Sequence, residues 1–313
     1  MNNEIHAVTG AFGYSGKYIA RRLLDRKKSV ITFTNSPNRE NEFNRAIKAF
    51  PYCFDDPKKL EESLRGVTVL YNTYWVRFNH TTFRHSTAVD NLLILIAAAK
   101  AAGVRRIVHI SITNPSRESH LEYFSGKALV EEALINSGVS YCILRPTVLF
   151  GKEDILINNI AWAVRKFPVI GVFGDGAYKL QPIFVDDLAE IAVNKGEERT
   201  NEILDAIGPE TYTYRCLVRR ISRVLGLKRL IVATPPVIAY MVGMITGWLV
   251  GDIMVTREEI EGLMENLLYT KSAPLAKTKL SHWLRENKNV LGKKYASELG
   301  RRKDLVSSYE NIV

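Results

Sequence analysis

Short runs of β-branched residues alternate with longer helical runs along the first half of the chain. Strands are predicted for IHAVTG, VITFTN, VTVLYNT, RRIVHISI and SYCILRPTVLFG, which begin at residues 5, 30, 67, 105 and 140. Helices are predicted between them over residues 16–26, 56–66, 81–102 and 123–138, with a weaker helix over 41–50. Strands and helices that alternate in this way form a parallel sheet covered on both faces. The pattern therefore predicts an α/β, doubly wound fold.

The regular alternation ends near the middle of the chain. After Gly151, only QPIFVDDLAEIAV, residues 181–193, has the pattern of a further strand and helix that return to the sheet. We therefore expect a Rossmann core formed by residues 1–150 together with about 181–195. The remainder, about 151–180 and 196–313, is expected to form a smaller C-terminal lobe that selects the substrate.

The composition is that of an ordinary soluble globular protein, with 46% apolar and 24% charged residues. Three cysteines, an odd number without metal-ligand spacing, indicate a reducing compartment, and the six histidines form no cluster. We therefore expect no metal site. The first residues, MNNEIHAVTG, contain neither a basic nor an apolar signal region, so the sequence predicts a cytoplasmic protein without an export signal.

Two segments of the second half favour contact with a surface. The run LIVATPPVIAYMVGMITGWLVG, residues 230–251, is uncharged, but its prolines leave an apolar part of about 15 residues, short of the roughly 20 that span a membrane. It predicts a docked helix or, alternatively, a monotopic membrane contact through residues 237–250. Residues 277–303 hold nine Lys or Arg and two Glu, a net charge of +7 out of +10. This basic tail predicts a solvated end, with anionic lipid or an acidic protein complex as alternative partners, and no nucleic acid, because no aromatic stacking platform accompanies the charge.

A glycine-rich loop connects the first predicted strand to the first predicted helix. Gly10, Gly13 and Gly16 recur at intervals of three in VTGAFGYSGKYIARRLL. Glycines let the backbone approach a diphosphate closely, and a helix N-terminus offers free N–H groups with a partial positive charge. The loop therefore predicts a dinucleotide-binding site that also includes Phe12 and Tyr14.

The residues at the end of the second strand indicate whether the adenosine ribose of the cofactor carries a 2′-hydroxyl or a 2′-phosphate. NAD enzymes usually place a carboxylate there for the 2′-hydroxyl. This chain has Thr34, Asn35 and Ser36, with Arg39 close by, and short donors with a cation suit a 2′-phosphate. We therefore favour NADP as the cofactor, with NAD as the alternative because Glu40 is near.

Tyr123 and Lys127 form the one Tyr-x-x-x-Lys pair of the chain, and this spacing puts both side chains on one helix face. Two residues on a solvated helix would look the same. The pair, however, opens the helix that follows the strand IVHISIT, in a chain that begins with a phosphate loop. This order favours a proton-transfer or cofactor-facing role.

With these parts in this order, the chain resembles the short-chain dehydrogenase/reductase superfamily, in its extended or atypical, epimerase/dehydratase-like branch. Within it, the chain is similar to the group that contains the NADPH-binding accessory subunit of mitochondrial complex I. The resemblance covers the whole chain and is carried by TNSPNR, YNTYWVRFNH, HISITNPS, YFSGKA, LRPTVLFG, INNIAW and FGDGAYKLQPIFVDDLA.

The resemblance implies catalytic roles for three residues. Tyr123 would be the proton donor or acceptor, and Lys127 would bind the nicotinamide ribose and assist the phenol. The hydroxyl that usually polarises the substrate carbonyl falls on Ile112, so Ser111 is the candidate, with Thr113 as the alternative.

The resemblance also implies further cofactor contacts. These are Asn72, Thr73 and Tyr74 after the fourth strand, and Pro146 and Val148 near the nicotinamide amide. A separate departure concerns the adenine, since Cys53 stands where many relatives have an aspartate.

The adenine contact would then be left to Phe54 or Asp55.

Two function classes remain. The first is an NADP-dependent oxidoreductase, or an epimerase or dehydratase, acting on an unidentified carbonyl or alcohol, for which the apolar run of residues 234–251 favours an apolar compound. The second is an NADP(H)-binding structural or redox-sensing component of a larger, membrane-associated complex.

Overall fold

A computed structural model describes residues 4–311 and divides the chain into two compact units. The first contains Met1–Pro146 and Val185–Asp205, and the second contains Thr147–Phe184 and Ala206–Val313. The sequence placed the corresponding boundaries near residues 150, 180 and 195. Each unit has its own hydrophobic core.

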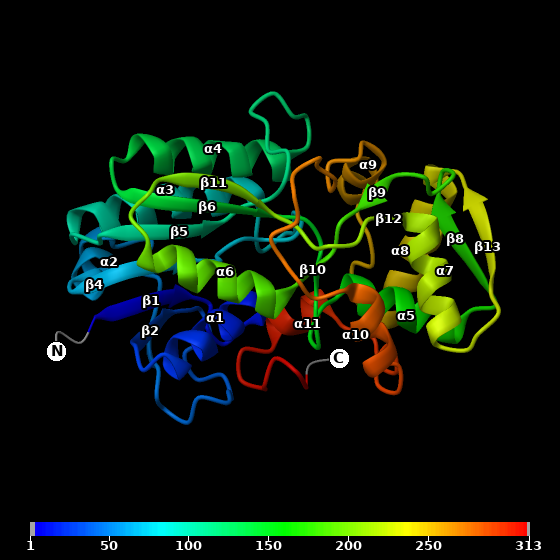
Figure 1. The fold of residues 1–313 in the computed structure, drawn as a ribbon, viewed down its shortest axis with the longest axis horizontal. Helices are drawn as coiled ribbons and strands as arrows, with labels where there is room; N and C mark the ends of the chain where they lie inside the picture. Colours follow the sequence, from blue (N-terminus) through cyan, green and yellow to red (C-terminus); the bar gives the residue numbers. More distant parts are fainter. Residues whose placement is uncertain (1–3, 312–313) are drawn as a thin grey trace. The chain divides into compact units, whose positions relative to one another are not determined.

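The first unit is built on a seven-stranded sheet in the order β11-β6-β5-β4-β1-β2-β3 (Figure 1). Its strands are β1 (Ile5–Thr9), β2 (Ser29–Phe33), β3 (Lys48–Phe50), β4 (Val67–Asn72), β5 (Arg106–Ile110), β6 (Ser140–Pro146) and β11 (Glu202–Ala206). The pairs from β3 through β6 are parallel. The strand order reverses direction at β1, which confirms the predicted doubly wound Rossmann fold.

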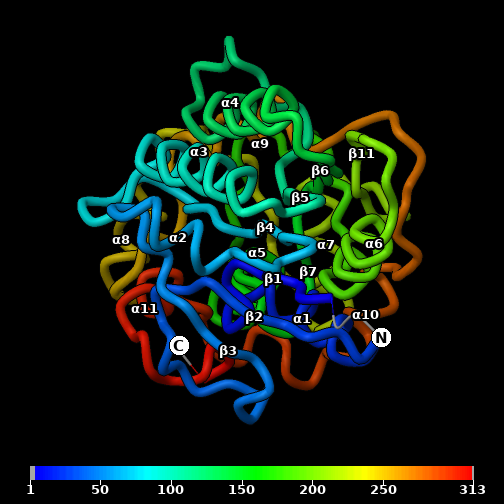
Figure 2. The backbone as a smooth tube through the Cα atoms, turned by 90° about the vertical axis from the view of Figure 1, so that its left-hand side faces the viewer, coloured from blue at the N-terminus to red at the C-terminus, as the bar shows by residue number. Residues whose placement is uncertain are grey.

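Five helices cover the two faces of this sheet. They are α1 (Tyr14–Asp25), α2 (Pro57–Leu64), α3 (His85–Ala101), α4 (Glu122–Asn136) and α6 (Val185–Glu197). Helices α3 and α4 lie on one face, and α1 and α6 lie on the other (Figures 1 and 2). Asp56 caps α2, within the helix predicted over residues 56–66, by accepting from the N–H of Lys59 at 3.2 Å, and Pro57 follows at the first helical position.

Three predicted elements differ in the structure. Residues 41–50 do not form a helix, because Asn44 and Arg45 have left-handed φ angles of 46° and 68°, and the segment ends in β3. The predicted strand over 140–151 is divided into β6 and β7 (Leu149–Phe150). The strand after Gln181 is β10 (Ile183–Phe184), which pairs with β7 instead of joining the large sheet. The seventh strand of that sheet is β11, which the periodicity did not reveal.

The second unit combines short strands with helices. In addition to β7 and β10 it contains α5 (Leu156–Lys166), β8 (Val169–Phe173), β9 (Lys179–Leu180), β12 (Tyr212–Thr213), α7 (Tyr214–Val224), β13 (Leu230–Thr234), α8 (Pro236–Val250), α9 (Arg257–Met264), α10 (Leu280–Glu286) and α11 (Glu298–Lys303). Helix α8 is the predicted apolar helix; it follows Pro235 and ends at Gly251, whose φ is 66°. Among the described residues, no helix combines the length and apolar character that crossing a membrane requires.

Candidate functional site

The β1–α1 loop is held by its glycines. Gly10 adopts a φ of 69° and donates its N–H to the carbonyl of Phe33 at 2.8 Å. Gly13 donates to the carbonyl of Gly10 at 2.9 Å. A Cβ at Gly16 would overlap that same carbonyl oxygen, whereas a Cβ at Gly13 would lie 3.2 Å from it. The tight packing of α1 against the loop therefore requires glycine at position 16.

The amino end of α1 is suited to an anion. Its N-cap residue, Gly13, offers no side chain to the free N–H groups, and the first turn contains no acidic residue. The two aromatic residues of the loop pack against neighbours: Phe12 is buried, 6.4 Å from the ring of Phe43, and Tyr14 lies edge-on to Tyr18 at 6.2 Å. The backbone N–H groups and the positive end of the helix dipole thus form a cradle that fits a diphosphate.

The predicted 2′-phosphate residues form one turn after β2. The N–H of Ser36 donates to Thr34 Oγ1 at 3.0 Å, and the N–H of Arg39 donates to the carbonyl of Ser36 at 3.2 Å. These three residues are buried, whereas Asn35 and Glu40 are exposed. The turn brings two hydroxyls and a cation together at the end of the strand.

Three aromatic rings lie together where β3 and β4 end. Phe54 stacks on Tyr52 with ring centroids 4.9 Å apart, and Tyr74 meets both rings edge-on at 5.0 and 5.3 Å. Asn91 donates to the hydroxyl of Tyr74 at 2.8 Å, while Cys53 adopts a left-handed φ of 47°. Burial raises the pKa of Tyr52, so its phenol stays protonated. This aromatic cluster is an apolar wall of the kind that suits a nucleobase.

A polar row crosses the carboxyl ends of three strands. The hydroxyl of Thr9 donates to Asn72 Oδ1 at 3.2 Å and accepts from the N–H of Thr73 at 2.7 Å. Asn72 Oδ1 also accepts from the N–H of Tyr74, so its amide nitrogen donates to His109 Nδ1 at 2.9 Å. This assigns the proton of the neutral imidazole to Nε2, which has no hydrogen-bond partner among the described residues.

His109 is a residue that sequence reasoning missed. It is buried, and burial with the nearby Lys127 cation lowers its pKa well below the ordinary value. The available signal was an ionisable residue inside the apolar strand RRIVHISI. Its buried Nε2–H is an unsatisfied donor among the described residues, and the Lys127 cation is close enough to disfavour the charged imidazole.

Tyr123 and Lys127 meet at one indole ring. Lys127 Nζ lies 4.3 Å from the centre of the Trp75 ring and donates to the carbonyl of Ile110 at 2.8 Å. The ring of Tyr123 approaches Trp75 edge-on at 5.8 Å and His85 at 5.5 Å. The two predicted residues therefore lie side by side, at the carboxyl end of β5.

The environment of Lys127 is almost dry. Only 2% of its surface is exposed, and this burial lowers its pKa to about 7, against a smaller opposing effect of Glu131. Gly126 allows this packing, because a Cβ there would lie 3.1 Å from the Trp75 ring. Trp75 is thus a neighbour of the predicted pair as well as part of the core.

The hydroxyl of Ser111 has a different partner from the predicted one. It donates to the carboxylate of Glu131, which is buried and also accepts from Arg145 Nε at 3.1 Å. The next two residues, Ile112 and Thr113, are also buried. The N–H of Thr113 donates to the carbonyl of Pro146 at 3.0 Å. Ser111 therefore belongs to a Ser111–Glu131–Arg145 network.

Val148 lies in the second unit, where its carbonyl accepts from the N–H of Ile183 at 2.9 Å. The remaining predicted residues, from the phosphate loop to Lys127, all belong to the first unit. They lie at or after the carboxyl ends of β1 to β5, or in the first turns of helices α1 and α4. This is the edge of a doubly wound sheet where ligands bind.

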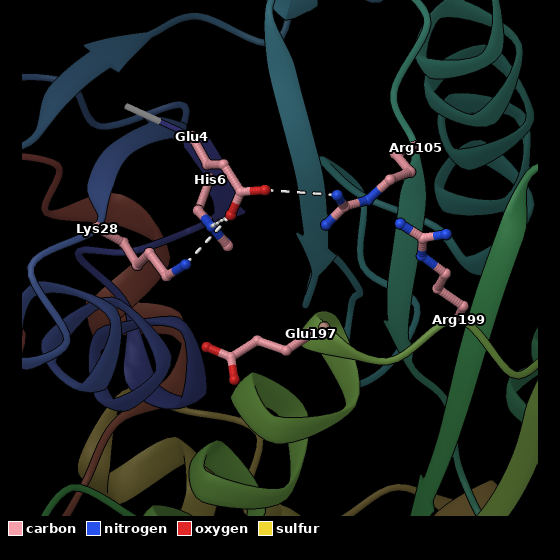
Figure 3. Close-up of a pocket in the computed structure, with 7 residues that line it drawn as sticks. Glu4, His6, Lys28, Arg105, Glu197 and Arg199 are labelled. Atoms are coloured by element: carbon pink, nitrogen blue, oxygen red, sulfur yellow. Dashed lines mark hydrogen bonds and ion pairs between the residues drawn. The ribbon is translucent and has the colours of Figure 1, made fainter. Parts of the chain in front are cut away.

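A distinct pocket lies at the opposite, amino edge of the sheet. It has a volume of about 370 Å³ and is lined by Glu4, His6, Lys28, Arg105, Gly196, Glu197 and Arg199. Lys28 and Arg105 both reach the Glu4 carboxylate, at 3.1 and 3.4 Å (Figure 3). None of the predicted site residues lines this pocket. Glu4 thus pairs with two of the cations that line the pocket, and the amino ends of parallel strands are not where this fold binds nucleotides.

Comparison with known proteins identifies the first unit. Residues 10–159 match a family described as NAD(P)H-binding. The chain carries an NAD(P)H-binding domain. This match confirms the predicted NAD(P)-binding domain, and NAD(P) is its cofactor class.

Two curated relatives of this NAD(P)H-binding domain are mitochondrial. The NADH dehydrogenase (ubiquinone) 1 alpha subcomplex subunit 9 of Arabidopsis thaliana is 23% identical, over 68% of this chain and 56% of that protein. The 40 kDa subunit of the NADH-ubiquinone oxidoreductase of Neurospora crassa is 24% identical, over 75% of this chain and 64% of that protein. The matched region thus spans less than two thirds of either relative.

The fold is also found in a solved reductase structure. The NADPH-dependent quinone oxidoreductase of Escherichia coli, complexed with NADPH, superimposes with a TM-score of 0.72 at 19% identity. The match covers 90% of this chain and 99% of that one. At this identity, the likeness concerns the fold alone.

Proposed function

We propose that the protein is an NADP-dependent oxidoreductase, or an epimerase or dehydratase that oxidises its substrate transiently, with Tyr123 as the acid/base. The observation that carries the proposal is the convergence of Tyr123 and Lys127 on the Trp75 ring, at the carboxyl edge of the sheet, where doubly wound folds bind nucleotides. Its substrate would be a small alcohol or carbonyl compound.

The preference for NADP rests on the turn after β2. Thr34, Ser36 and Arg39 gather donors and a cation there, and no carboxylate lies at the strand end. The loop of Gly10, Gly13 and the amino end of α1 would hold the diphosphate. When bound, NADP supplies or accepts the hydride.

The proton would move through this chain's own residues. The Tyr123 hydroxyl would give a proton to the substrate oxygen during reduction and take it back during oxidation. Lys127 would favour the phenolate when it is charged, because an ammonium beside a phenol stabilises the anion. Its pKa of about 7 allows it to change charge near neutral pH, where general acid–base catalysis is most efficient.

Tyr123→Phe tests this proposal. We expect turnover on a panel of carbonyl compounds to fall by roughly 100- to 10,000-fold, because one proton-transfer group is lost. NADPH affinity, measured by calorimetry, should stay within about threefold, since a phenol is not needed to hold a diphosphate. Tyr141→Phe is the matched control, because Tyr141 lies on β6 and packs against the core of the first unit. Full turnover in Tyr123→Phe would contradict the acid/base role.

A second function is favoured by a specific observation. The hydroxyl of Ser111 donates a hydrogen bond to Glu131, and Ile112 occupies the usual carbonyl-polarising position. A protein that binds NADP(H) without turnover, as a structural or redox-sensing component of a complex, would need no such hydroxyl. The two mitochondrial relatives support this alternative. Tight NADPH binding without turnover on any member of the panel would favour it over catalysis.

A further inference from the structure

Helix α8 exposes its large apolar side chains. Trp248 is 81% exposed, and Val237 and Leu249 are each 69% exposed. The other exposed apolar residues of the helix are Ile238, Met241, Val242, Met244 and Ile245. A surface helix of a globular protein ordinarily directs such residues inward and polar ones outward. Contiguous apolar surface of this kind marks an interaction site.

The inward face of α8 is made of small residues instead. Gly243 and Gly247 are its two buried residues. A Cβ at Gly243 would lie 2.8 Å from Val255, and one at Gly247 would lie 2.6 Å from the carbonyl oxygen of Asp252. The helix therefore packs closely through its glycines, and this close packing leaves the large side chains outside.

The exposed face offers few groups for hydrogen bonding with a protein partner. Residues 230–251 contain no charged side chain. The hydroxyl of Thr246 donates to the carbonyl of Val242 at 2.8 Å. The Arg257 guanidinium lies over the ring of Tyr240, 5.0 Å from its centre. Protein interfaces need about one hydrogen bond per 100–200 Å², whereas hydrocarbon needs none. The chemistry of this face therefore suits lipid better than protein.

A basic loop adjoins the C-terminal end of α8. Asp252, just after the helix, accepts from the hydroxyl of Tyr295 at 3.1 Å and from the N–H of Glu298 at 2.9 Å. This contact holds the loop of residues 288–295 beside the helix end. The loop exposes Val290 together with Lys288, Lys293 and Lys294.

A second exposed apolar group is linked to the same loop. The ring of Trp162 lies 5.2 Å from Tyr295 and 5.8 Å from Phe167, which is exposed at the end of α5. Val169 and Leu230, paired across β8 and β13, are exposed as well. The sequence neighbours of these apolar residues include two further exposed lysines, Lys166 and Lys228.

We propose that α8 and the exposed lysines near it (Lys166, Lys228, Lys288, Lys293 and Lys294) bind the surface of an anionic lipid bilayer, with α8 lying in the plane of the interface. Fifteen residues of helix extend about 22 Å, less than the roughly 30 Å of a bilayer's hydrocarbon core, so the helix lies along the surface. The exposed Lys288, Lys293 and Lys294, within a segment whose net charge is +7, complement acidic headgroups. Trp248 would sit at the headgroup level, where indole rings concentrate.

Flotation of the full-length protein with vesicles tests the proposal. The wild type should float with vesicles of phosphatidylcholine and phosphatidylglycerol, and much less with pure phosphatidylcholine. The double variant Ile245→Glu/Trp248→Glu should lose roughly tenfold or more of this binding, because two acidic groups would enter an apolar, anionic interface. Lys293→Glu/Lys294→Glu should weaken binding to anionic vesicles by roughly fivefold or more for each residue.

The matched control is Leu93→Glu, at an apolar residue of α3 that is 41% exposed. It should float like the wild type. NADPH affinity and thermal unfolding show whether each variant is folded. If the double variant does not fold, Trp248→Phe provides a second test: the wild type should show a blue-shifted fluorescence component with anionic vesicles that this variant lacks.

Other outcomes would overturn the proposal. A wild-type protein that stays unbound with anionic vesicles and shows no fluorescence shift is one such result. A dimer in solution that dissociates in Ile245→Glu/Trp248→Glu, without vesicle binding, would assign α8 to contact with a second copy. Equal flotation with neutral and anionic vesicles would contradict the role of the lysines. All of these results are independent of whether Tyr123 catalyses turnover.

Discussion

The β1–α1 loop and the β5–α4 region both contribute to the predicted site, but their geometry has different origins. The loop is shaped by glycines within seven residues of one another, through backbone contacts such as Gly13 N–H to the Gly10 carbonyl. In the β5–α4 region, the surroundings of a side chain are set by residues distant in the chain. Lys127, for example, lies over the ring of Trp75. A short-range backbone motif can therefore be assigned from sequence, whereas a proton-transfer site depends on its surroundings.

The largest effect is expected for Gly16→Ala, which tests the loop side of this comparison. The added Cβ would overlap the Gly10 carbonyl oxygen, so the loop and α1 must separate. We expect a loss of about 3 kcal/mol in unfolding free energy. NADPH affinity by calorimetry should fall by roughly 100-fold, equivalent to about 2.7 kcal/mol.

Gly13→Ala is the matched control, because its Cβ would lie 3.2 Å from the same oxygen. It should lower the thermal unfolding midpoint less than Gly16→Ala does. Wild-type stability and NADPH affinity in Gly16→Ala would show that the loop is not held as tightly as the structure indicates.

The next effect concerns the buried network of the β5–α4 region. Glu131→Leu would leave the Arg145 guanidinium and the Ser111 hydroxyl without their carboxylate partner. We expect a loss of about 3 kcal/mol, measured by urea unfolding, because breaking a buried pair leaves a charge uncompensated.

Glu132 provides the control for this change. It pairs with Arg117, and both side chains are more than half exposed. Glu132→Leu should change the unfolding free energy by only about 0.5 kcal/mol. Similar losses in the two variants would mean that Glu131 is no more important to the fold than a surface residue.

A smaller effect is expected from the titration of Lys127. An unfolded lysine stays protonated to about pH 10.4, whereas burial lowers the pKa of Lys127 to about 7 in the fold. Between these values the unfolded chain binds more protons, so raising the pH should stabilise the fold, by at most about 1.4 kcal/mol per pH unit.

The measurement is urea unfolding of cofactor-free wild type and Lys127→Met between pH 7 and pH 9. As the pH rises, the unfolding free energy of the wild type should increase relative to that of Lys127→Met. Lys100→Met, at an exposed residue of α3, should run parallel to the wild type. A parallel profile for Lys127→Met would mean that the ammonium is not buried.

The smallest effect is expected for Ser111→Ala. Its hydroxyl donates to Glu131, so we expect a stability loss of about 1 kcal/mol and a fall in kcat of less than tenfold. A 100-fold fall in kcat at nearly unchanged stability would instead assign carbonyl polarisation to Ser111, as the resemblance implied.

Much of the cofactor half of the fold could be predicted, and the reason is physical. The phosphate loop, the Asp56 cap and most of the strand–helix alternation depend on interactions within a few residues. The helix expected over 41–50 failed because a long-range pairing with β2 and two left-handed residues outweighed a weak periodicity. The predicted roles of Tyr123, Lys127 and Ser111 stay predictions.

Several residues near the site could not have been assigned from their own positions. His109 became a candidate only because the register of β4 and β5 places it opposite Asn72. Tyr52 entered the aromatic cluster because the chain folds it against Phe54 and Tyr74.

The α/β alternation, the glycine loop and the apolar character of residues 237–250 can be read from the chain alone, because periodicity and backbone freedom are local properties. The near-complete burial of Lys127, the contact of Ser111 with Glu131 and the outward direction of the large side chains of α8 arise only in the folded protein. These features depend on solvent exclusion and on contacts between residues far apart in the chain. Such contacts exist only once the sheet has set its register and the helices have packed on it.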